Sequence, residues 1–172
     1  TVDGVEEEGF FAGDFTLAEI KTLGAAQQFA ERDQSFNGKF RIPTLVEIID
    51  LAKTKSHEKS RTIGIYPETK HPAYHRALGL PLEDRLIAAL KSAGWDNADA
   101  PVFIQSFEPG SLRYLRARIR AKQIQLVMAS GIAADGALEF NPPYGRPYDW
   151  TSSGDARTFR DLTTAQGLAE IK

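Results

Sequence analysis

The feature that most constrains the fold is a short apolar run at residues 62–67, Thr-Ile-Gly-Ile-Tyr-Pro, which passes directly into Glu-Thr-Lys. Side chains alternate across a strand, so Tyr66, Glu68 and Lys70 should share one face and the isoleucines before them the other. A Glu/Lys pair at the carboxyl end of a buried strand is typical of barrel and doubly wound enzymes, whose active sites lie at that edge of the sheet. The alternative is an ordinary edge strand with solvated charges, whose pairing contributes less than about 1 kcal/mol.

Helical and strand patterns alternate along the rest of the chain. A capping box at Thr44 and Glu47 opens the first clear helix. Pro81 lies in the first turn of the next helix, which Gly94 ends, and Pro109 opens another. The expected strands are 62–67, 101–107 and 124–129. Strands joined by helical crossovers form a parallel sheet covered on both faces, so the expected fold class is α/β.

The length of the chain is that of one domain, at 172 residues. The strands that can be assigned fall short of a closed (β/α)8 barrel, which needs about eight strands and roughly 250 residues. We therefore expect residues 1–172 to be a single partial (β/α)8 TIM-type barrel domain with parallel strands and crossover helices, an internal piece of a larger barrel. Residues 1–42 would be an insertion-like connection with a short helix from Thr16 to Leu23. Residues 43–172 would supply the β/α units and end in a helix opened by a Thr163/Gln166 capping box.

Composition excludes several functions. The net charge of −2 and pI near 5.9 give no general attraction to nucleic acid or to an anionic membrane, and no run is long and apolar enough to span a bilayer. The sequence has 0 Cys, which excludes disulfides, thiolate metal ligands and cysteine nucleophiles. The basic residues between Arg113 and Lys122 alternate with Leu112, Leu115 and Ile119. We interpret them as the solvated face of a core helix rather than a nucleic-acid surface.

Further candidate residues lie near the expected site. His71 and His75 follow Lys70, but no nucleophile is paired with either, so a catalytic role is not favoured. The proline- and aromatic-rich segment 141–150 follows the last expected strand. Loops after strands build the mouth of a barrel site, so its aromatic residues would either wall a substrate pocket or pack the loop against the surface. The second interpretation is favoured.

The segments Ile42–Glu47, Gly64–Lys70 and Gln105–Phe107 follow one another in an order and spacing that resemble the glycerophosphodiester phosphodiesterases. The segment Gly9–Ile20 is similar to what precedes these motifs in the larger, periplasmic-type members. The resemblance covers nearly the whole chain. Its most specific part is the Tyr-Pro-Glu-Thr-Lys strand combined with the later Gln-Ser-Phe.

The resemblance implies a (β/α)8 barrel that hydrolyses glycerophosphodiesters to an alcohol and glycerol 3-phosphate with a divalent metal, calcium or magnesium. It implies that Glu68 is a metal ligand and that Lys70 is catalytic, lying beside the phosphate. Gln105 and Phe107 would bind substrate. These residue types suit the chemistry, because a hard cation prefers carboxylate oxygens and a phosphodiester transition state needs positive charge at its nonbridging oxygens. The resemblance also implies a periplasmic or secreted location.

The sequence departs from the family pattern in its catalytic motifs. Family members place a His-Arg pair, a Glu-x-Asp metal pair and a second catalytic His before these motifs, and this combination does not precede them in this sequence. Calcium takes about six to eight oxygen ligands, so one carboxylate does not hold it. The chain alone should therefore be inactive, although its motifs indicate the reaction that a longer parent enzyme would catalyse. The alternatives are a non-catalytic binding or interaction module derived from such a barrel and a phospholipase D-like toxin barrel.

Overall fold

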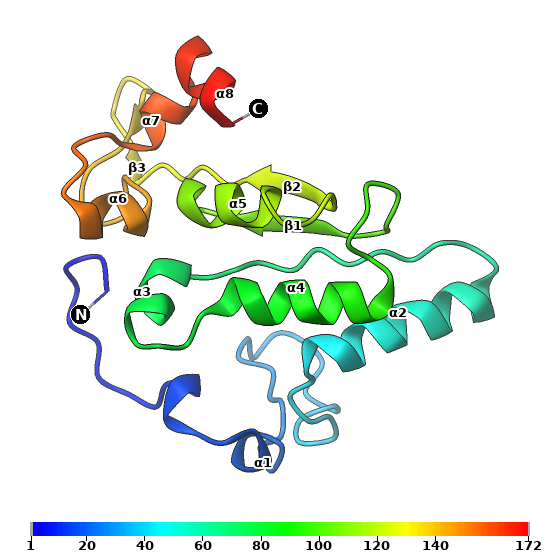
Figure 1. Cartoon of the computed structure of the whole chain (residues 1–172). Helices are drawn as coiled ribbons and strands as arrows, with labels where there is room; N and C mark the ends of the chain where they lie inside the picture. Colours follow the sequence, from blue (N-terminus) through cyan, green and yellow to red (C-terminus); the bar gives the residue numbers. More distant parts are fainter. Residues whose placement is uncertain (1, 172) are drawn as a thin grey trace.

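The computed structural model describes residues 2–171 and has an α/β architecture, as expected (Figure 1). The front of the chain contains a 3₁₀ turn, η1 (Ala12–Asp14), and the short helix α1 (Leu17–Ile20). The middle contains α2 (Leu45–Lys59), α3 (Pro72–Ala77), α4 (Leu82–Ala93), β1 (Phe103–Ser106), α5 (Pro109–Arg116) and β2 (Lys122–Gln125). The last part contains the hairpin β3 (Gly131–Ile132) and β4 (Leu138–Glu139), followed by α6 (Tyr148–Ser153), α7 (Phe159–Leu162) and α8 (Ala165–Ile171).

The central sheet is parallel, with β1 between β2 and the segment that contains Glu68. Ile65 N–H donates to the Pro101 carbonyl at 2.9 Å, and Thr69 N–H donates to the Gln105 carbonyl at 3.0 Å. Pro67 has no N–H, so the rung between these two bonds is missing and the pairing divides into two separate bridges. The prediction of a strand here that runs parallel to its neighbour at 101–107 is confirmed, with the pairing centred on residues 65–69 rather than 62–67.

Helices α2, α4 and α5 cover one face of this sheet. In Figure 1, α2 and α4 lie next to each other on one side of the strand segment, and α5 crosses β1 and β2. The principal core lies between them. Its fully buried members include Leu90, Val102, Ile104 and Leu115.

Within residues 2–171 the opposite face of the sheet is covered only at its carboxyl end, where Phe107 packs against Phe159 of α7. Tyr66 and Phe103, which lie side by side on that face, are 50% and 42% exposed. The expectation that both faces are covered is therefore wrong for the described residues. The physical reason is the strand order. Right-handed crossovers between successive, adjacent strands place every helix on the same side, and only a reversal of strand order would place a helix on the other side.

Capping signals located the starts of several helices. Thr44 and Glu47 form the predicted capping box at α2, and Thr16 and Glu19 form one at α1. Gly94 ends α4 in the left-handed conformation at φ 74°, as its position predicts. Pro81 is the residue before α4 rather than part of its first turn.

Other boundaries differ from the prediction. Helix α5 ends at Arg116, and Lys122 already belongs to β2. The Leu126 N–H donates to the Ser106 carbonyl at 2.9 Å, and this is the last bond of the pairing. The pairing ends there because the neighbouring chain leaves β1 after Ser106 and begins α5 at Pro109. The expected strand 124–129 is therefore shifted toward the N-terminus, to Lys122–Gln125.

The last helix also begins one residue later than expected. Thr164, not Thr163, caps α8, and its hydroxyl accepts the Gly167 N–H at 3.0 Å. The separate helix α7, capped by Thr158 and Asp161, had not been predicted. Together α6 and α7 build a second core around Trp150, Phe159 and Leu162. Nowhere between residues 2 and 171 does a helix reach the length and apolarity needed to cross a bilayer.

Candidate functional site

The register of the sheet places the predicted site residues beside one another. Glu68 is paired with Gln105, and Gln105 in turn with Ile124 of β2. Continuing the register, Lys70 is level with Phe107. Tyr66, Glu68 and Lys70 are exposed, whereas Thr69 between them is buried, which agrees with the alternation expected of a strand. The predicted residues therefore occupy the carboxyl end of the sheet.

A cavity of about 310 Å³ lies at this end of the sheet. Lys70 and His71 line it from the end of the first strand segment, and Phe107 and Glu108 line it from the end of β1. The loop before α6 closes another side with Tyr144, Arg146 and Tyr148. These walls come from segments that follow strands, which is where parallel α/β sheets place their sites, and Asp3 and Glu7 from the start of the chain also line the cavity.

The structure brings Lys70 and Phe107 together in this cavity, but Glu68 and Gln105 do not line it. Glu68 lines a different cavity of about 610 Å³, together with Leu17, Leu45 and Arg85. That cavity lies between the outer edge of the strand segment and helices α1, α2 and α4. The roles assigned to Glu68 and Gln105 remain predictions.

Charges of both signs face the site cavity. Lys70 and Arg146 provide the positive side, Asp3 and Glu7 provide carboxylates, and His71 also lines the cavity. Partial burial lowers the pKa of His71, and Lys70 and His75 lower it further, while Asp3 and Glu7 act in the opposite direction. The imidazole is therefore mainly neutral at neutral pH.

Glu108 is the unusual group of the site. It is 2% exposed, and burial raises the pKa of its carboxyl to about 8. Oε2 accepts the Ala73 N–H at 3.0 Å, whereas Oε1 has no partner among the described residues. Nearby, burial also raises the pKa of Asp149, which accepts the Gly110 N–H at 2.8 Å.

Sequence reasoning did not select Glu108. The signal that could have found it is alternation, because Ile104, Ser106 and Glu108 follow the buried parity of β1 while the predicted Gln105 and Phe107 follow the other. A glutamate that continues the buried parity just past the end of a strand is expected to lie under the helices, where its carboxyl is desolvated.

The aromatic residues of segment 141–150 divide between the cavity and the second core, and whether the cavity binds substrate stays a prediction. Tyr144 and Tyr148 line the cavity, whereas Trp150 is buried in the second core. The Tyr148 ring stands edge-on to His71 at 5.7 Å and to Tyr74 at 6.1 Å. Such contacts fix the position of the loop against the strand end.

A metal site is not formed by the described residues alone. No group of three or more His, Asp or Glu side chains in residues 2–171 is arranged to hold a cation. Glu68 offers one carboxylate, which does not fit the ligand demand of calcium or magnesium. No chemical step is therefore assigned to a metal here, and the metal role of Glu68 remains a prediction.

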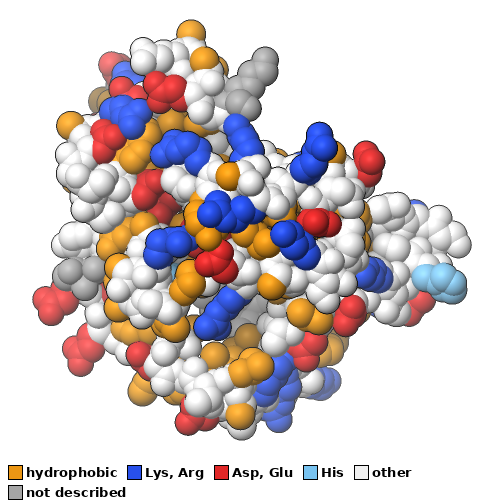
Figure 2. Space-filling view, viewed as in Figure 1, with side chains coloured by type: hydrophobic (Ala, Val, Ile, Leu, Met, Phe, Trp, Pro, Cys, Tyr) orange, Lys and Arg blue, Asp and Glu red, His pale blue; other side chains and the backbone are white. Residues whose placement is uncertain are grey.

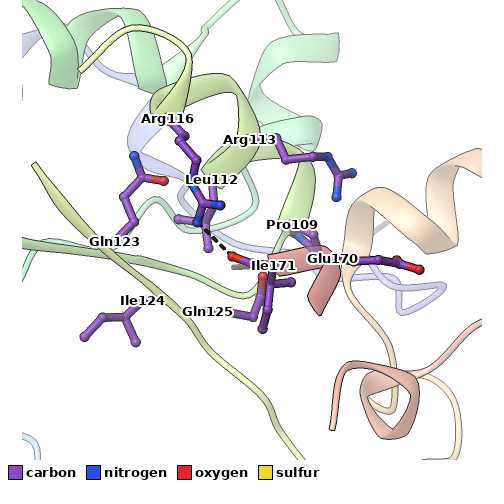
Figure 3. Close-up of a pocket in the computed structure, with 9 residues that line it drawn as sticks. All are labelled: Pro109, Leu112, Arg113, Arg116, Gln123, Ile124, Gln125, Glu170 and Ile171. Atoms are coloured by element: carbon purple, nitrogen blue, oxygen red, sulfur yellow. Dashed lines mark hydrogen bonds between the residues drawn. The ribbon is translucent and has the colours of Figure 1, made fainter. Parts of the chain in front are cut away.

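A third cavity, of about 300 Å³, lies at the outer edge of β2 (Figure 3). It is enclosed by α5, β2 and α8, and the Arg116 side chain crosses it to donate to the Ile171 carbonyl at 2.8 Å. Arg116 therefore ties the C-terminal helix to α5. This cavity shares no lining residue with the one that Lys70 and His71 line at the carboxyl ends of the strands.

The cations of α5 and the following turn are exposed, as the sequence predicted for a solvated face. Figure 2 shows Lys and Arg side chains on this side of the molecule interspersed with acidic and hydrophobic ones. The guanidinium of Arg118 stacks on Tyr114 at 3.5 Å, and that of Arg76 lies 4.5 Å from the same ring. Part of the basic surface thus covers an aromatic side chain.

Comparison with known proteins identifies relatives of this chain. The model of the glycerophosphoryl diester phosphodiesterase family matches residues 1–138. A glycerophosphodiester phosphodiesterase of Arabidopsis thaliana is 35% identical over 167 residues, covering 83% of this chain and 44% of the relative. One of Caldanaerobacter subterraneus is 33% identical over 136 residues, covering 77% of this chain and 48% of the relative. One of Haemophilus influenzae is 26% identical over 121 residues, covering 64% and 33%. The chain spans less than half the length of these relatives.

Proposed function

Because the chain belongs to the glycerophosphoryl diester phosphodiesterase family, we propose that it is part of an enzyme that hydrolyses glycerophosphodiesters to an alcohol and glycerol 3-phosphate. The observation that carries the proposal is the cavity at the carboxyl ends of the strands, where Lys70 and Phe107 meet. Its substrate would be a small-molecule glycerophosphodiester. A periplasmic or secreted location is proposed on the resemblance alone.

We propose further that the sheet is part of a (β/α)8 barrel. Successive strands are neighbours, and their helices lie on one side, which is the arrangement that curls into a barrel. The face carrying Tyr66, Glu68 and Gln105 would then line the barrel interior. A barrel interior is covered by other strands, which accounts for two large aromatic side chains being exposed here.

In this arrangement each predicted residue has a distinct task. The Lys70 ammonium stabilises the negative charge that develops on the nonbridging phosphate oxygens. Phe107 gives the cavity an apolar wall against which the glycerol backbone packs, and Gln105 supplies amide hydrogen bonds to substrate hydroxyls. Glu68 would be one ligand of a calcium or magnesium ion, with the remaining ligands supplied from outside residues 2–171.

The test is an assay with glycerophosphocholine in the presence of calcium or magnesium, using both this chain and a longer protein that contains it. We expect turnover by the longer protein only. Lys70→Ala in that protein should lower kcat/KM on the order of a hundredfold or more, because a charge that stabilises the transition state is lost. Lys122→Ala is the matched control, since Lys122 is an exposed lysine at the opposite end of the same sheet. Unchanged kcat/KM in Lys70→Ala would contradict the role of Lys70.

The alternative is a non-catalytic binding module derived from such a barrel. The observation that favours it is that residues 2–171 do not form a metal site by themselves. The same assay separates the two, because a binding module would bind glycerol 3-phosphate without turnover by the longer protein at any metal concentration.

A further inference from the structure

Buried polar side chains are concentrated at the two strand ends beside the site cavity. Thr69, Ser106, Glu108 and Ser111 are each no more than 4% exposed. Buried polar groups are costly unless they are hydrogen-bonded, so a cluster of them in a fold has a structural or functional reason. Thr69 ends the first strand segment, Ser106 ends β1, Glu108 lies in the turn that follows, and Ser111 lies in the first turn of α5.

These side chains bond one segment to the other. The Ser106 hydroxyl donates to the Thr69 carbonyl at 3.0 Å, and the Ser111 and Thr69 hydroxyls are 3.2 Å apart. Glu108 Oε2 accepts the Ala73 N–H at 3.0 Å. We call Ser106, Glu108 and Ser111 the strand-end latch. The latch therefore holds the chain at Thr69 and again at Ala73.

The residues between these two anchors are Lys70, His71 and Pro72. Lys70 and His71 both line the site cavity. His71 has φ 48°, in the left-handed region that a side chain with a Cβ rarely adopts. Such a conformation costs on the order of 1 kcal/mol or more and persists only where the surroundings impose it. The anchors on either side of His71 are the contacts that impose it.

Glu108 also lines the cavity, with one oxygen bonded to Ala73 and the other without a partner among the described residues. Burial disfavours its charge, and the neighbouring carboxyls of Asp149, Glu83 and Asp3 disfavour it further. A neutral side chain that accepts one backbone N–H is what the geometry requires. Glutamine has the same shape and the same acceptor.

We propose that Glu108 is a positioning residue for this site, acting with Ser106 and Ser111 to hold residues 69–73 so that Lys70 and His71 face the cavity. It touches the backbone of that segment rather than the phosphate. The inference rests on the proposed function only for the importance of Lys70. The positioning itself is a property of the fold.

The test uses the full chain with Glu108→Ala, Glu108→Gln and a matched control, Asp149→Ala. Asp149 is also a buried carboxyl that accepts a backbone N–H, but its partner is Gly110 rather than residues 69–73. The readouts are amide hydrogen exchange at Ala73 and the pKa of the His71 imidazole by NMR, with the exposed His57 as an internal reference. Neither readout requires turnover, so failure of the proposed activity leaves the test intact.

Glu108→Ala should raise the exchange rate of the Ala73 amide about tenfold or more, as expected when a buried N–H loses its acceptor. The pKa of His71 should rise toward its ordinary value as the segment becomes solvated. Glu108→Gln should restore both values, and Asp149→Ala should leave both unchanged. Binding of inorganic phosphate should weaken in Glu108→Ala and recover in Glu108→Gln.

Two results would overturn the proposal. One is an unchanged Ala73 exchange rate in Glu108→Ala, and the other is a Glu108→Gln variant as impaired as Glu108→Ala. If Glu108→Ala does not fold, Ser111→Ala tests the other anchor, because it removes only the hydroxyl that contacts Thr69. Unchanged exchange at Thr69 and unchanged His71 pKa in Ser111→Ala would then reject the latch.

Discussion

Burial of the Glu108 carboxyl makes the stability of the fold depend on pH. Its pKa is raised from 4.5 to about 8, so between these values the folded state holds a proton that the unfolded state has released. Stability is therefore greatest below about pH 4.5 as far as this group is concerned, and it falls as the pH rises toward 8. Above that range the folded carboxyl is charged, and its burial cost is fully present.

Glu108→Gln should remove this dependence, because an amide does not titrate. Each unit of pKa shift corresponds to about 1.4 kcal/mol, so the variant should be more stable than the wild type at pH 8 by on the order of 2–4 kcal/mol. The difference should shrink toward pH 5. Urea unfolding at a series of pH values measures it. A constant difference between the two proteins across that range would contradict a raised pKa at Glu108.

At the residue scale, the sequence identified the candidate site residues at the exposed positions of the strand ends better than those at the buried positions. Lys70 and Phe107 were identified because family motifs and alternation both point to them, and they do share a cavity. Glu108 was not identified, and the left-handed backbone of His71 was not predicted, because both features depend on contacts with residues distant in the sequence. Burial of Glu108 depends on α3, whose docking the local pattern does not encode.

At the element scale, Gly64 allows the first strand segment to approach β1 closely. A Cβ at this position would lie 2.5 Å from the Pro101 carbonyl oxygen, which is the acceptor for Ile65 N–H. Gly64→Ala would have to push the two strands apart at the bond that begins their pairing. Overpacking of this kind costs about 1–3 kcal/mol.

We therefore expect Gly64→Ala to lower the free energy of unfolding by about 2 kcal/mol, measured by urea denaturation. Gly9→Ala is the matched control, because a Cβ at Gly9 meets nothing within 4 Å. The control should unfold at the wild-type midpoint. Equal midpoints for both variants would mean that the strands adjust without loss.

Element boundaries were predictable where a local signal fixes them. The Thr44/Glu47 capping box and Gly94 act within one turn of their helices, so the pattern was sufficient. The end of α5 and the start of β2 depend on register with β1 instead. Lys122 pairs with Phe103, and this pairing, not the apolar run at 124–129, decides where the strand lies.

At the scale of the whole molecule, the sheet described by residues 2–171 has an open strand edge at each end. Within residues 2–171 it ends at the strand segment 65–69 on one side and at β2 on the other. The sequence predicted a parallel α/β fold from its alternating pattern. It also suggested cover on both faces, because periodicity shows that a strand is apolar but not whether a helix or another strand packs on it.

Open edges and an exposed apolar face favour association between copies of the chain. We expect the chain to self-associate in sedimentation velocity as its concentration rises through the micromolar range. Phe103→Glu should reduce this association, because it places a charge in the middle of the uncovered face, where Phe103 is 42% exposed. Leu168→Glu is the matched control, since Leu168 is 54% exposed but lies on α8, away from that face.

The two variants separate association through the sheet from general stickiness. If the sheet face is responsible, Phe103→Glu stays monomeric at concentrations where Leu168→Glu still associates. If both charges reduce association equally, exposed apolar area as such is the cause. A wild-type chain that remains monomeric throughout would show that the uncovered face is tolerated in water, contrary to the barrel interpretation of that face. The comparison thus tests the fold proposal without any measurement of catalysis.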